Sequence, residues 1–182
     1  QIEDAIAPNR ALDELVRMKE AGLIGSIGLG VRPHDFHRSA IETGQIDIIL
    51  TFLDYTLLDQ SVAETTLPLA RQHDIGIILA SVFGMGLLTG LEPDLESDRR
   101  RHPDREPIAH RLWQWCQTEG INIRHLAMQF CLQAPIDGIV MFGPSSIQHV
   151  EEAVQAAKAD VPLHIWQELE TEFGIKLGAG FD

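Results

Sequence analysis

Residues 76–81 read Gly76-Ile77-Ile78-Leu79-Ala80-Ser81, a short run of branched apolar residues between two small ones. Three similar runs cover residues 26–30, 46–51 and 138–143, and amphipathic helical patterns separate all four. Runs that are apolar at nearly every position are typical of parallel strands buried on both faces. The sequence therefore predicts an α/β fold built on a parallel sheet.

We expect four strands, at residues 25–30, 46–52, 76–81 and 138–142. About seven helices should accompany them, near residues 8–21, 33–43, 61–72, 108–119, 122–133, 147–159 and 162–173. Ser61 and Glu64 have the spacing of a capping box at the start of the third helix. Four parallel strands cannot close a barrel, because closure at the usual tilt takes about eight. The first and last strands would then be open edges that need cover.

In parallel α/β sheets the chemistry lies at the carboxyl ends of the strands. Those ends here are Gly30, Asp54-Tyr55, Ser81 to Gly86 and Gly143 to Ser146. They carry almost no acid, base or nucleophile. Tyr55 is the only tyrosine and could serve as an acid, although a packing role is the preferred interpretation. The sequence thus indicates a ligand cradle without a reactive centre.

Two of the strand ends have the form of anion sites. The segment 81–88 contains two glycines, which allow backbone N–H groups to approach an anion. The segment 142–146 reads Phe-Gly-Pro-Ser-Ser and opens a helix, where free N–H groups and the helix dipole attract negative charge. An ordinary turn with a helix cap is the alternative for the second segment. Neither a GxGxxG nor a GxxxxGK[ST] pattern occurs.

The histidines and cysteines give weaker signals. His34 and His37 are three residues apart without a third ligand nearby, so a surface pair is favoured over a metal site. His149 lies one turn into the helix after Gly143, where it could reach a phosphate or could simply be an exposed helix residue. Cys116 and Cys131 lack CxxC spacing and are expected to be reduced thiols in the core.

Composition limits the class of partner. The chain has 182 residues, is 45% hydrophobic and carries a formal net charge of -13, which opposes binding to nucleic acid or to an anionic membrane. No apolar run approaches the ~20 residues of a membrane span, and no signal peptide is apparent, so we expect a cytoplasmic protein. The sequence starts at Gln1 and its first element is a helix, so we expect a segment before it. The charged stretch 92–107, with Arg99-Arg100-Arg101, is either a solvated surface loop or a mobile lid.

Several stretches together resemble a known family. They are Leu23 to Gly30, Tyr55-Thr56-Leu57-Leu58-Asp59-Gln60, Ser81-Val82-Phe83 through Gly86-Leu87-Leu88, and Gly143 with Ser145-Ser146 and Glu151-Glu152. Their order and spacing are similar to the C-terminal half of the aldo-keto reductases, most of all the aldose dehydrogenase branch. The resemblance implies an α/β fold that is the second half, strands 5–8, of a (β/α)8 TIM barrel binding NADP or NAD. The Asp, Tyr, Lys and His of the family's catalytic tetrad match no position here, so we expect no activity from the chain alone.

The resemblance also assigns the cofactor to particular residues. The nicotinamide end would lie near Gly30 and Val31. The pyrophosphate would lie against the segment Ser81, Val82, Phe83, Gly84, Gly86 and Leu88. The adenosine end would lie near Gly143, Ser145, Ser146, His149 and Glu152. His149 stands where an arginine often holds the 2′-phosphate, which weakens any preference for NADP over NAD.

We therefore interpret residues 1–182 as one domain, the cofactor-binding half of an enzyme that passes hydride between NAD(P) and a sugar-like or aldehyde carbon. Its expected partners are the dinucleotide, that substrate, and either the missing N-terminal half or a second copy. A non-catalytic half-barrel module or a degenerate fragment is the alternative. An unrelated doubly wound domain is disfavoured by the ordered motifs.

Overall fold

The computed structural model describes residues 2–180 except 94–95, 97, 99 and 101–102. Its centre is a parallel sheet of four strands in the order β1-β2-β3-β4. The strands are β1 (Gly28–Gly30), β2 (Ile48–Phe52), β3 (Gly76–Ala80) and β4 (Gly138–Met141). The predicted parallel α/β sheet is therefore confirmed, with each strand next to its neighbour in sequence.

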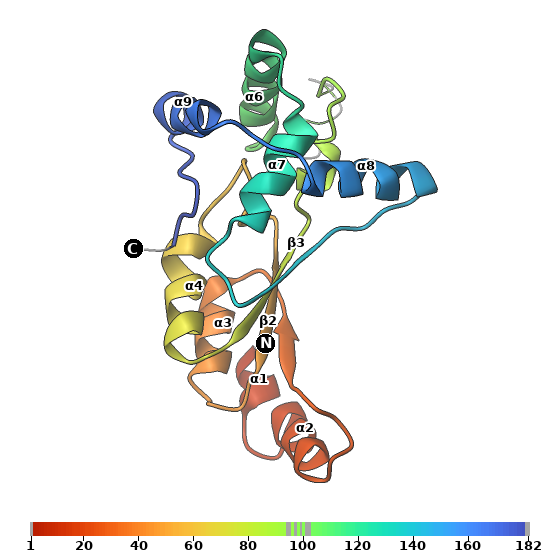
Figure 1. Cartoon of the computed structure of the whole chain (residues 1–182). Coiled ribbons are helices and arrows are strands. Elements are labelled where there is room, and N and C mark those ends of the chain that lie inside the picture. Colours follow the sequence, from red (N-terminus) through yellow and green to blue (C-terminus); the bar gives the residue numbers. More distant parts are fainter. Residues whose placement is uncertain (1, 94–95, 97, 99, 101–102, 181–182) are drawn as a thin grey trace.

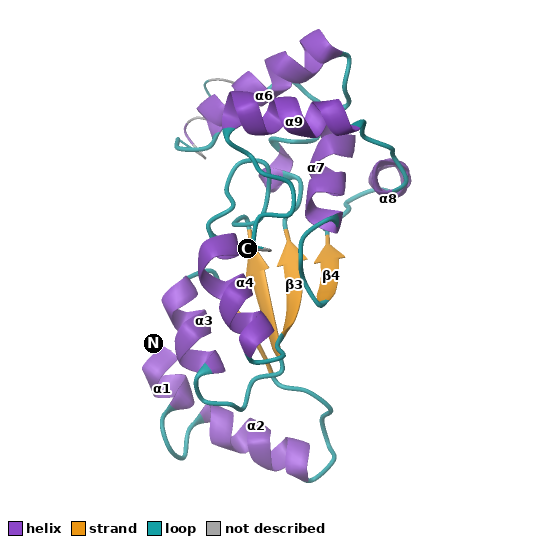
Figure 2. Cartoon of the chain, turned by 60° about the vertical axis from the view of Figure 1, so that its left-hand side comes forward, coloured by secondary structure: helices purple, strands orange, loops and turns teal. Residues whose placement is uncertain are grey.

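Helices occupy one side of the sheet and both of its ends. They are α1 (Ile2–Ile6), α2 (Ala11–Glu20), α3 (His34–Ile41), α4 (Val62–Gln72), the short 3₁₀ turn η1 (Gly84–Gly86), α6 (Glu106–Glu119), α7 (Ile123–Leu132), α8 (Ile147–Ala157) and α9 (Leu163–Phe173). Helices α3 and α4 lie side by side along one face of the sheet (Figure 1). Helices α6, α7 and α9 gather beyond the carboxyl ends of the strands, whereas α2 lies at the opposite end (Figure 2).

Some predicted boundaries were wrong, for local reasons. The first strand begins at Gly28 and not at residue 25, because the N–H of Ile27 donates to the Asp47 carboxylate at 2.7 Å instead of joining the ladder. Lys19 holds that carboxylate in place through its Nζ, 2.6 Å from Oδ1. A further helix, α1, was not expected.

The capping box predicted from Ser61 and Glu64 does not form. Ser61 has helical backbone angles (φ −59°, ψ −27°), and its side chain makes no capping hydrogen bond to α4. An N-cap side chain works from an extended backbone, which Ser61 lacks. Instead, the Asp59 Oδ1 accepts a hydrogen bond from the Ser61 N–H at 3.0 Å. The helix is therefore preceded by a turn that the aspartate stabilises.

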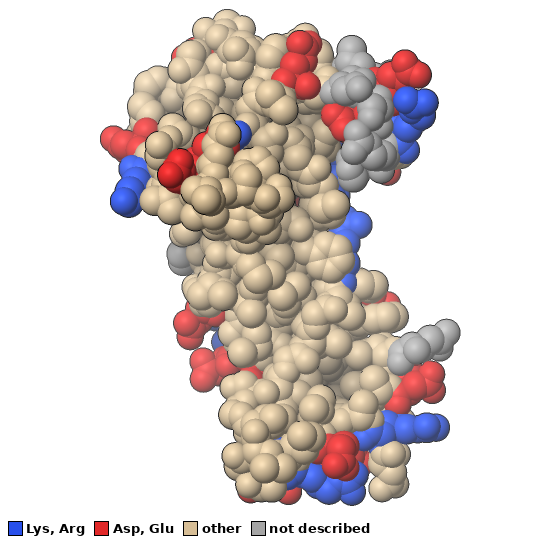
Figure 3. Space-filling model, turned by 90° about the vertical axis from the view of Figure 1, so that its right-hand side faces the viewer, with Lys and Arg blue, Asp and Glu red and all other residues tan. Residues whose placement is uncertain are grey.

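The two faces of the sheet differ. Alternate residues of β2 and β3, such as Ile49 and Leu79, are fully buried beneath the helices. The opposite face is apolar too, yet the described residues leave it uncovered: Ile139 is 58% exposed and Met141 is 40% exposed. Figure 3 looks onto this side, which is largely free of charge between charged groups above and below. The described residues thus cover only one face of the strands, which were expected to be buried on both.

The structure shows the positions of several cysteine and histidine side chains whose burial the sequence did not settle. Cys116 and Cys131 are buried and free, as predicted. His37 is fully buried, so the expected surface pair was wrong: its Nδ1 lies 2.9 Å from the Thr66 hydroxyl, and its ring stacks on His34. Among the described residues, no His, Cys, Asp and Glu side chains group as a metal site would need. None of the helices in that same part of the chain is long and apolar enough to cross a membrane.

Candidate functional site

A pocket of about 540 Å³ opens at the carboxyl ends of β3 and β4. The loops after both strands and the start of α8 form it. Its lining residues are Ser81, Val82, Phe83, Met85, Gly86, Thr89, Leu91, Arg124, Phe142, Gly143, Pro144, Ser145, His149 and Glu152. This is where ligands bind in parallel α/β sheets.

The loop after β3 turns sharply. Ser81 has a φ of +63°, which is uncommon for a residue with a side chain. Gly84 follows with a φ of +59°, and a Cβ there would lie 2.9 Å from the Leu58 Cδ1. Only glycine therefore fits at position 84 without displacing Leu58. The turn directs Phe83 against Phe142, with ring centroids 6.2 Å apart, so that the two loops share an apolar contact.

This loop offers fewer free donors than the sequence suggested. The N–H of Gly84 donates to the Ser81 carbonyl at 2.9 Å, and the N–H of Gly86 donates to the Phe83 carbonyl at 3.1 Å. The Leu88 N–H also donates to the Phe83 carbonyl, at 3.1 Å, and the Leu88 side chain lies in the core. The turn itself therefore uses the N–H groups of both glycines and of Leu88, so that neither glycine offers its own N–H to an anion.

The loop after β4 is the one better suited to hold an anion. The Ser146 hydroxyl caps α8 by accepting from the His149 N–H at 3.2 Å. The remaining N–H groups of the first helical turn point toward the pocket end of α8, as in other helix N-termini that bind anions. A Cβ on Gly143 would meet nothing within 4 Å, so the backbone is open to a ligand there. The His149 Nδ1 lies 3.1 Å from the Ser145 hydroxyl, so the imidazole folds back over the loop.

A charged pair lies on the pocket wall, and its arginine was not among the residues predicted from the sequence. The Arg124 Nη1 of α7 lies 2.8 Å from the Glu152 Oε2 of α8, and Arg124 also donates to the Thr89 carbonyl. The Gln148 amide donates to the other oxygen of Glu152 at 2.9 Å. The hydrogen bond from Gln148, followed by the charge and hydrogen bond of Arg124, lowers the pKa of Glu152. The pocket wall thus carries an ionised carboxylate bound by an arginine.

The structure brings most of the predicted site residues together. Ser81, Val82, Phe83, Gly86, Gly143, Ser145, His149 and Glu152 all line the pocket. Gly84 is buried beneath it, and Ser146 caps α8. Gly30 ends β1, the far edge strand, Val31 follows it, and neither residue lines this pocket. The predicted adenosine and pyrophosphate regions are therefore contiguous, and the predicted nicotinamide region is separate from them.

The reactive groups near the strand ends are buried or bonded. Tyr55 stacks on Phe130 at 5.2 Å, and its hydroxyl donates to the Ala179 carbonyl at 3.1 Å, which matches the preferred packing role. Burial raises the pKa of Tyr55, and it raises the pKa of Cys116 to about 12. The buried Asp54 carboxylate lies 2.9 Å from the His34 Nε2. None of these groups is poised to exchange a proton with a ligand in the pocket.

The excursion at 92–107 is described only in part. Residues 94–95, 97, 99 and 101–102, which include Arg99 and Arg101, lie outside the described residues. Its described end begins α6 at Glu106, two residues earlier than predicted. The interpretation of the whole excursion as a surface loop or a lid stays a prediction.

Comparisons with known proteins agree on one family. The sequence profile described as "Aldo/keto reductase family" matches residues 3–170. The chain is 29% identical to D-threo-aldose 1-dehydrogenase of Pseudomonas sp, covering 87% of this chain and 49% of that protein. It is 30% identical to pyridoxal 4-dehydrogenase of Microbacterium luteolum (90% and 47%) and 29% identical to L-galactose dehydrogenase of Arabidopsis thaliana (89% and 50%).

The structural comparison points the same way. The fold is similar to that of an aldo-keto reductase from Bacillus halodurans in its holo form, with a TM-score of 0.70, 22% identity, and coverage of 90% of this chain and 56% of that one. The apo form of the same protein gives a TM-score of 0.70 at 23% identity. The chain spans about half the length of the curated relatives it matches.

Proposed function

This chain belongs to the aldo/keto reductase family, and from that premise we propose that it is the dinucleotide-binding, C-terminal half of an NAD(P)-dependent oxidoreductase. The observation that carries the proposal is the pocket of about 540 Å³ between the carboxyl end of β3 and the N-terminus of α8. A dinucleotide needs an anion site for phosphate and an apolar wall for its rings. Helix α8 and the Phe83–Phe142 contact supply these two features.

The residues of the pocket are suited to the phosphate groups that NADP and NAD share. They do not favour one of the two cofactors over the other. Arg124 is the one arginine on the described pocket wall, and it is bound to Glu152. The imidazole of His149 cannot bind a 2′-phosphate bidentately as the guanidinium of an arginine would. We therefore expect NADP and NAD to bind with similar affinity.

The chemistry of the whole protein is part of the same proposal. The bound nicotinamide would supply or accept a hydride, and the residues of this chain would bind and orient the cofactor. No position of the chain corresponds to the family's proton-transferring tyrosine and lysine, so those groups would come from the missing N-terminal half. Relatives named for aldose, galactose and pyridoxal support a sugar-like or aldehyde substrate.

The uncovered face of the sheet supports the half-barrel assignment. Strands β1 to β4 would be strands five to eight of a (β/α)8 barrel, and their uncovered face would line its interior. Ile139 and Met141 lie on that face, and large exposed apolar patches are rare in monomers. The edges β1 and β4 also have unpaired backbone groups on their outer sides. We propose that the missing half covers this face in the whole protein, with self-association of the half-barrel as the outcome when that half is absent.

Calorimetric titration of NAD and NADP tests the cofactor proposal. We expect weak, salt-sensitive binding to this chain, because the net charge of -13 opposes an anionic ligand. Gly143→Trp should abolish binding, since its side chain would fill the open space that a phosphate needs. His149→Ala should weaken NADP binding more than NAD binding, because only NADP carries the 2′-phosphate that this side chain would contact.

A matched control and clear contrary outcomes complete the test. Gly25→Trp introduces the same side chain at a glycine that also has open space around it but lies before β1, away from the pocket. It should leave binding unchanged. Full binding in the Gly143 variant would remove the α8 loop from the site. Equal losses of NAD and NADP in the His149 variant would remove His149 from the 2′-phosphate region.

A further inference from the structure

A second group of charged residues lies at the carboxyl ends of β1 and β2, in the motif Tyr55 to Gln60. Reciprocal backbone hydrogen bonds between Thr56 and Asp59, of 2.8 and 3.3 Å, close a tight turn. The turn fixes the direction of the Asp59 carboxylate, and the Ser61 N–H occupies its Oδ1. Its Oδ2 is left to face the loops after β1 and before α6.

Two arginines from distant parts of the chain meet at that one oxygen. The Nη2 of Arg32, which follows β1, and the Nη2 of Arg105, which precedes α6, each lie 3.2 Å from the Asp59 Oδ2. Arg105 also donates to the Leu53 carbonyl at 2.9 Å. Leu53 holds the uncommon φ of +65°, so its carbonyl is presented to Arg105 by a strained backbone. The side chain of Arg105 is only 14% exposed.

These contacts engage only some of the N–H donors of the two guanidinium groups. A bidentate arginine–carboxylate pair has two parallel bonds of ~2.8 Å, whereas each arginine here makes one longer contact to a shared oxygen. Among the described residues, the hydrogen bonds of both groups involve Nη2 alone. One carboxylate thus faces two positive charges, and donor nitrogens remain on both arginines.

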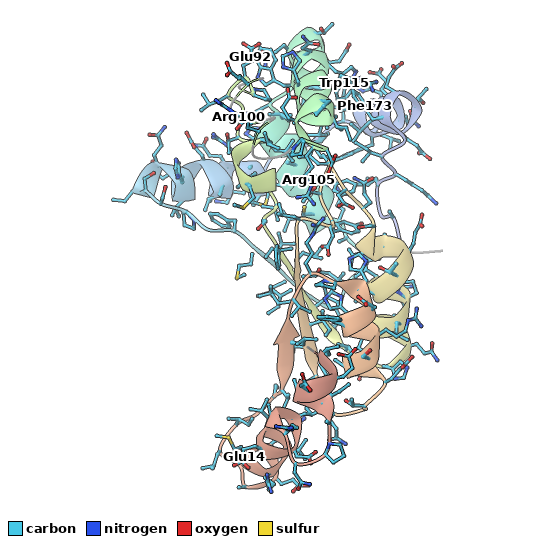
Figure 4. The ribbon with its side chains drawn as sticks, turned by 180° about the vertical axis from the view of Figure 1, so that it is seen from behind. Glu14, Glu92, Arg100, Arg105, Trp115 and Phe173 are labelled. Carbon is cyan, nitrogen blue, oxygen red and sulfur yellow. The ribbon has the colours of Figure 1, made fainter. Side chains whose placement is uncertain are left out.

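An open pocket of about 400 Å³ adjoins these donors. Its wall consists of Arg32, Leu53, Leu58, Asp59, Pro103, Asp104 and Arg105. Asp104 is exposed on the rim, where water screens its charge. Figure 4 places Arg105 between the strand ends and α6, while Arg100 and Glu92 lie further out. The pocket is therefore at the same end of the sheet as the proposed dinucleotide site, which is where parallel sheets bind substrates.

We propose that Arg32 and Arg105 bind the anionic oxygen group, a carboxylate or a phosphate ester, of a small ligand with a sugar-like skeleton. The sugar-like part of this statement rests on the proposed function, whereas the anion site rests on the two arginines and the pocket alone. Arg32 is about half exposed and can turn toward a ligand, while Arg105 is held by Leu53. The ligand then competes with the Asp59 carboxylate for the two guanidinium groups.

Three probes of one skeleton test the proposal in a calorimetric or NMR-detected titration: glucuronate, glucose 6-phosphate and glucose. We expect at least one of the two anions to bind with millimolar affinity and neutral glucose to bind much more weakly. Arg32→Gln should weaken anion binding about tenfold or more, the scale of one hydrogen bond to a charged group. Asp59→Asn should strengthen it several-fold, because the amide keeps the acceptor for Ser61 but no longer competes for the guanidinium groups.

Arg17→Gln is the matched control. Arg17 lies on α2 at the opposite end of the sheet and pairs with Glu14, so its loss changes the net charge equally but leaves the pocket intact. Binding of glucuronate alone identifies a carboxylate site, and binding of glucose 6-phosphate alone identifies a phosphate-ester site. Equal binding of glucose, or equal losses in the Arg17 and Arg32 variants, would overturn the proposal.

The test of this anion site can be distinguished from the test of dinucleotide binding. Arg32→Gln should leave the titration with NAD unchanged, because Arg32 does not line the pocket at β3 and β4. Lost anion binding with intact NAD binding is the result expected for the variant. Anion binding by a wild-type chain that fails to bind NAD would refute the proposed function but support this site.

Discussion

Gly138 provides a direct test of the sheet, because its position leaves no room for a side chain. It is the first residue of β4 and pairs with Ile77 of β3. A Cβ at this position would lie 1.7 Å from the carbonyl oxygen of Ile77, 2.7 Å from its carbon and 2.9 Å from its nitrogen. All three atoms belong to the backbone, so rotation of a side chain cannot relieve the clash. The substitution Gly138→Ala must therefore move one strand away from the other.

The size of the effect follows from that displacement. The strands must separate by roughly 1.5 Å before the Ile77 oxygen is at a tolerable distance from the new Cβ, which is enough to break the first hydrogen bonds of the pair. In the described part of the chain β4 pairs with β3 alone, so no other strand compensates. Overpacking typically costs ~1–3 kcal/mol and each lost backbone hydrogen bond ~1 kcal/mol, so we expect Gly138→Ala to lower the free energy of unfolding by about 2–4 kcal/mol.

Urea unfolding monitored by circular dichroism measures this loss. Gly143→Ala is the control: the residue lies two positions beyond the other end of β4, and a Cβ there would meet nothing within 4 Å. Its free energy of unfolding should stay within ~0.5 kcal/mol of the original. Equal stability of the two variants would refute the register in which Gly138 opposes Ile77.

Three further predictions concern activity, pH and association. In an assay with NAD(P) and a panel of aldoses and aldehydes, neither the chain nor its Tyr55→Phe variant should turn over substrate. The variant lacks the hydrogen bond to the Ala179 carbonyl, so its free energy of unfolding should fall by only about 0.5–1.5 kcal/mol. Activity that disappears in the variant would contradict the packing role. Burial lowers the pKa of His37 below 6.5, so its contribution to stability is full above that value and declines as the pH falls below it. The loss of stability from pH 7.5 to 5.5 should be smaller in His37→Gln, and an unchanged loss would assign the acid sensitivity to other groups. In light scattering after size-exclusion chromatography the chain should associate, and a cooperative monomer of 20.2 kDa would count against the half-barrel.

The sheet could be predicted from sequence because its signal is local. Each strand is a short apolar run, and each helix has its own spacing and end signals, so element type required no knowledge of distant contacts. Boundaries failed where a distant side chain replaced a backbone partner. The N–H of Ile27 donates to Asp47, which Lys19 holds, and these three residues lie far apart in sequence. No local pattern near residue 25 could reveal that the strand begins later.

The candidate site, like the sheet, has one part that local sequence patterns could predict and one part that depends on distant contacts. The contribution of the loops after β3 and β4 to a pocket was predictable, because glycine and hydroxyl residues directly follow buried strands. Arg124 was not, because its place on the wall depends on how α7 packs against α8. The cluster of Asp59 with Arg32 and Arg105 joins three separate segments and likewise has no local signature.

The sequence also indicates how much of the sheet is suited to burial. In a sheet with one wet face, alternate residues are polar. Here Ile48 and Ile78 on the uncovered face are as apolar as Ile49 and Ile77 on the covered face. A sequence that keeps both faces apolar is suited to burial of both, and water on one face costs free energy in proportion to the apolar area it contacts. The uncovered face therefore accounts for the failed expectation of double burial: the strand pattern is that of a sheet buried on both sides, and the described residues cover one of them.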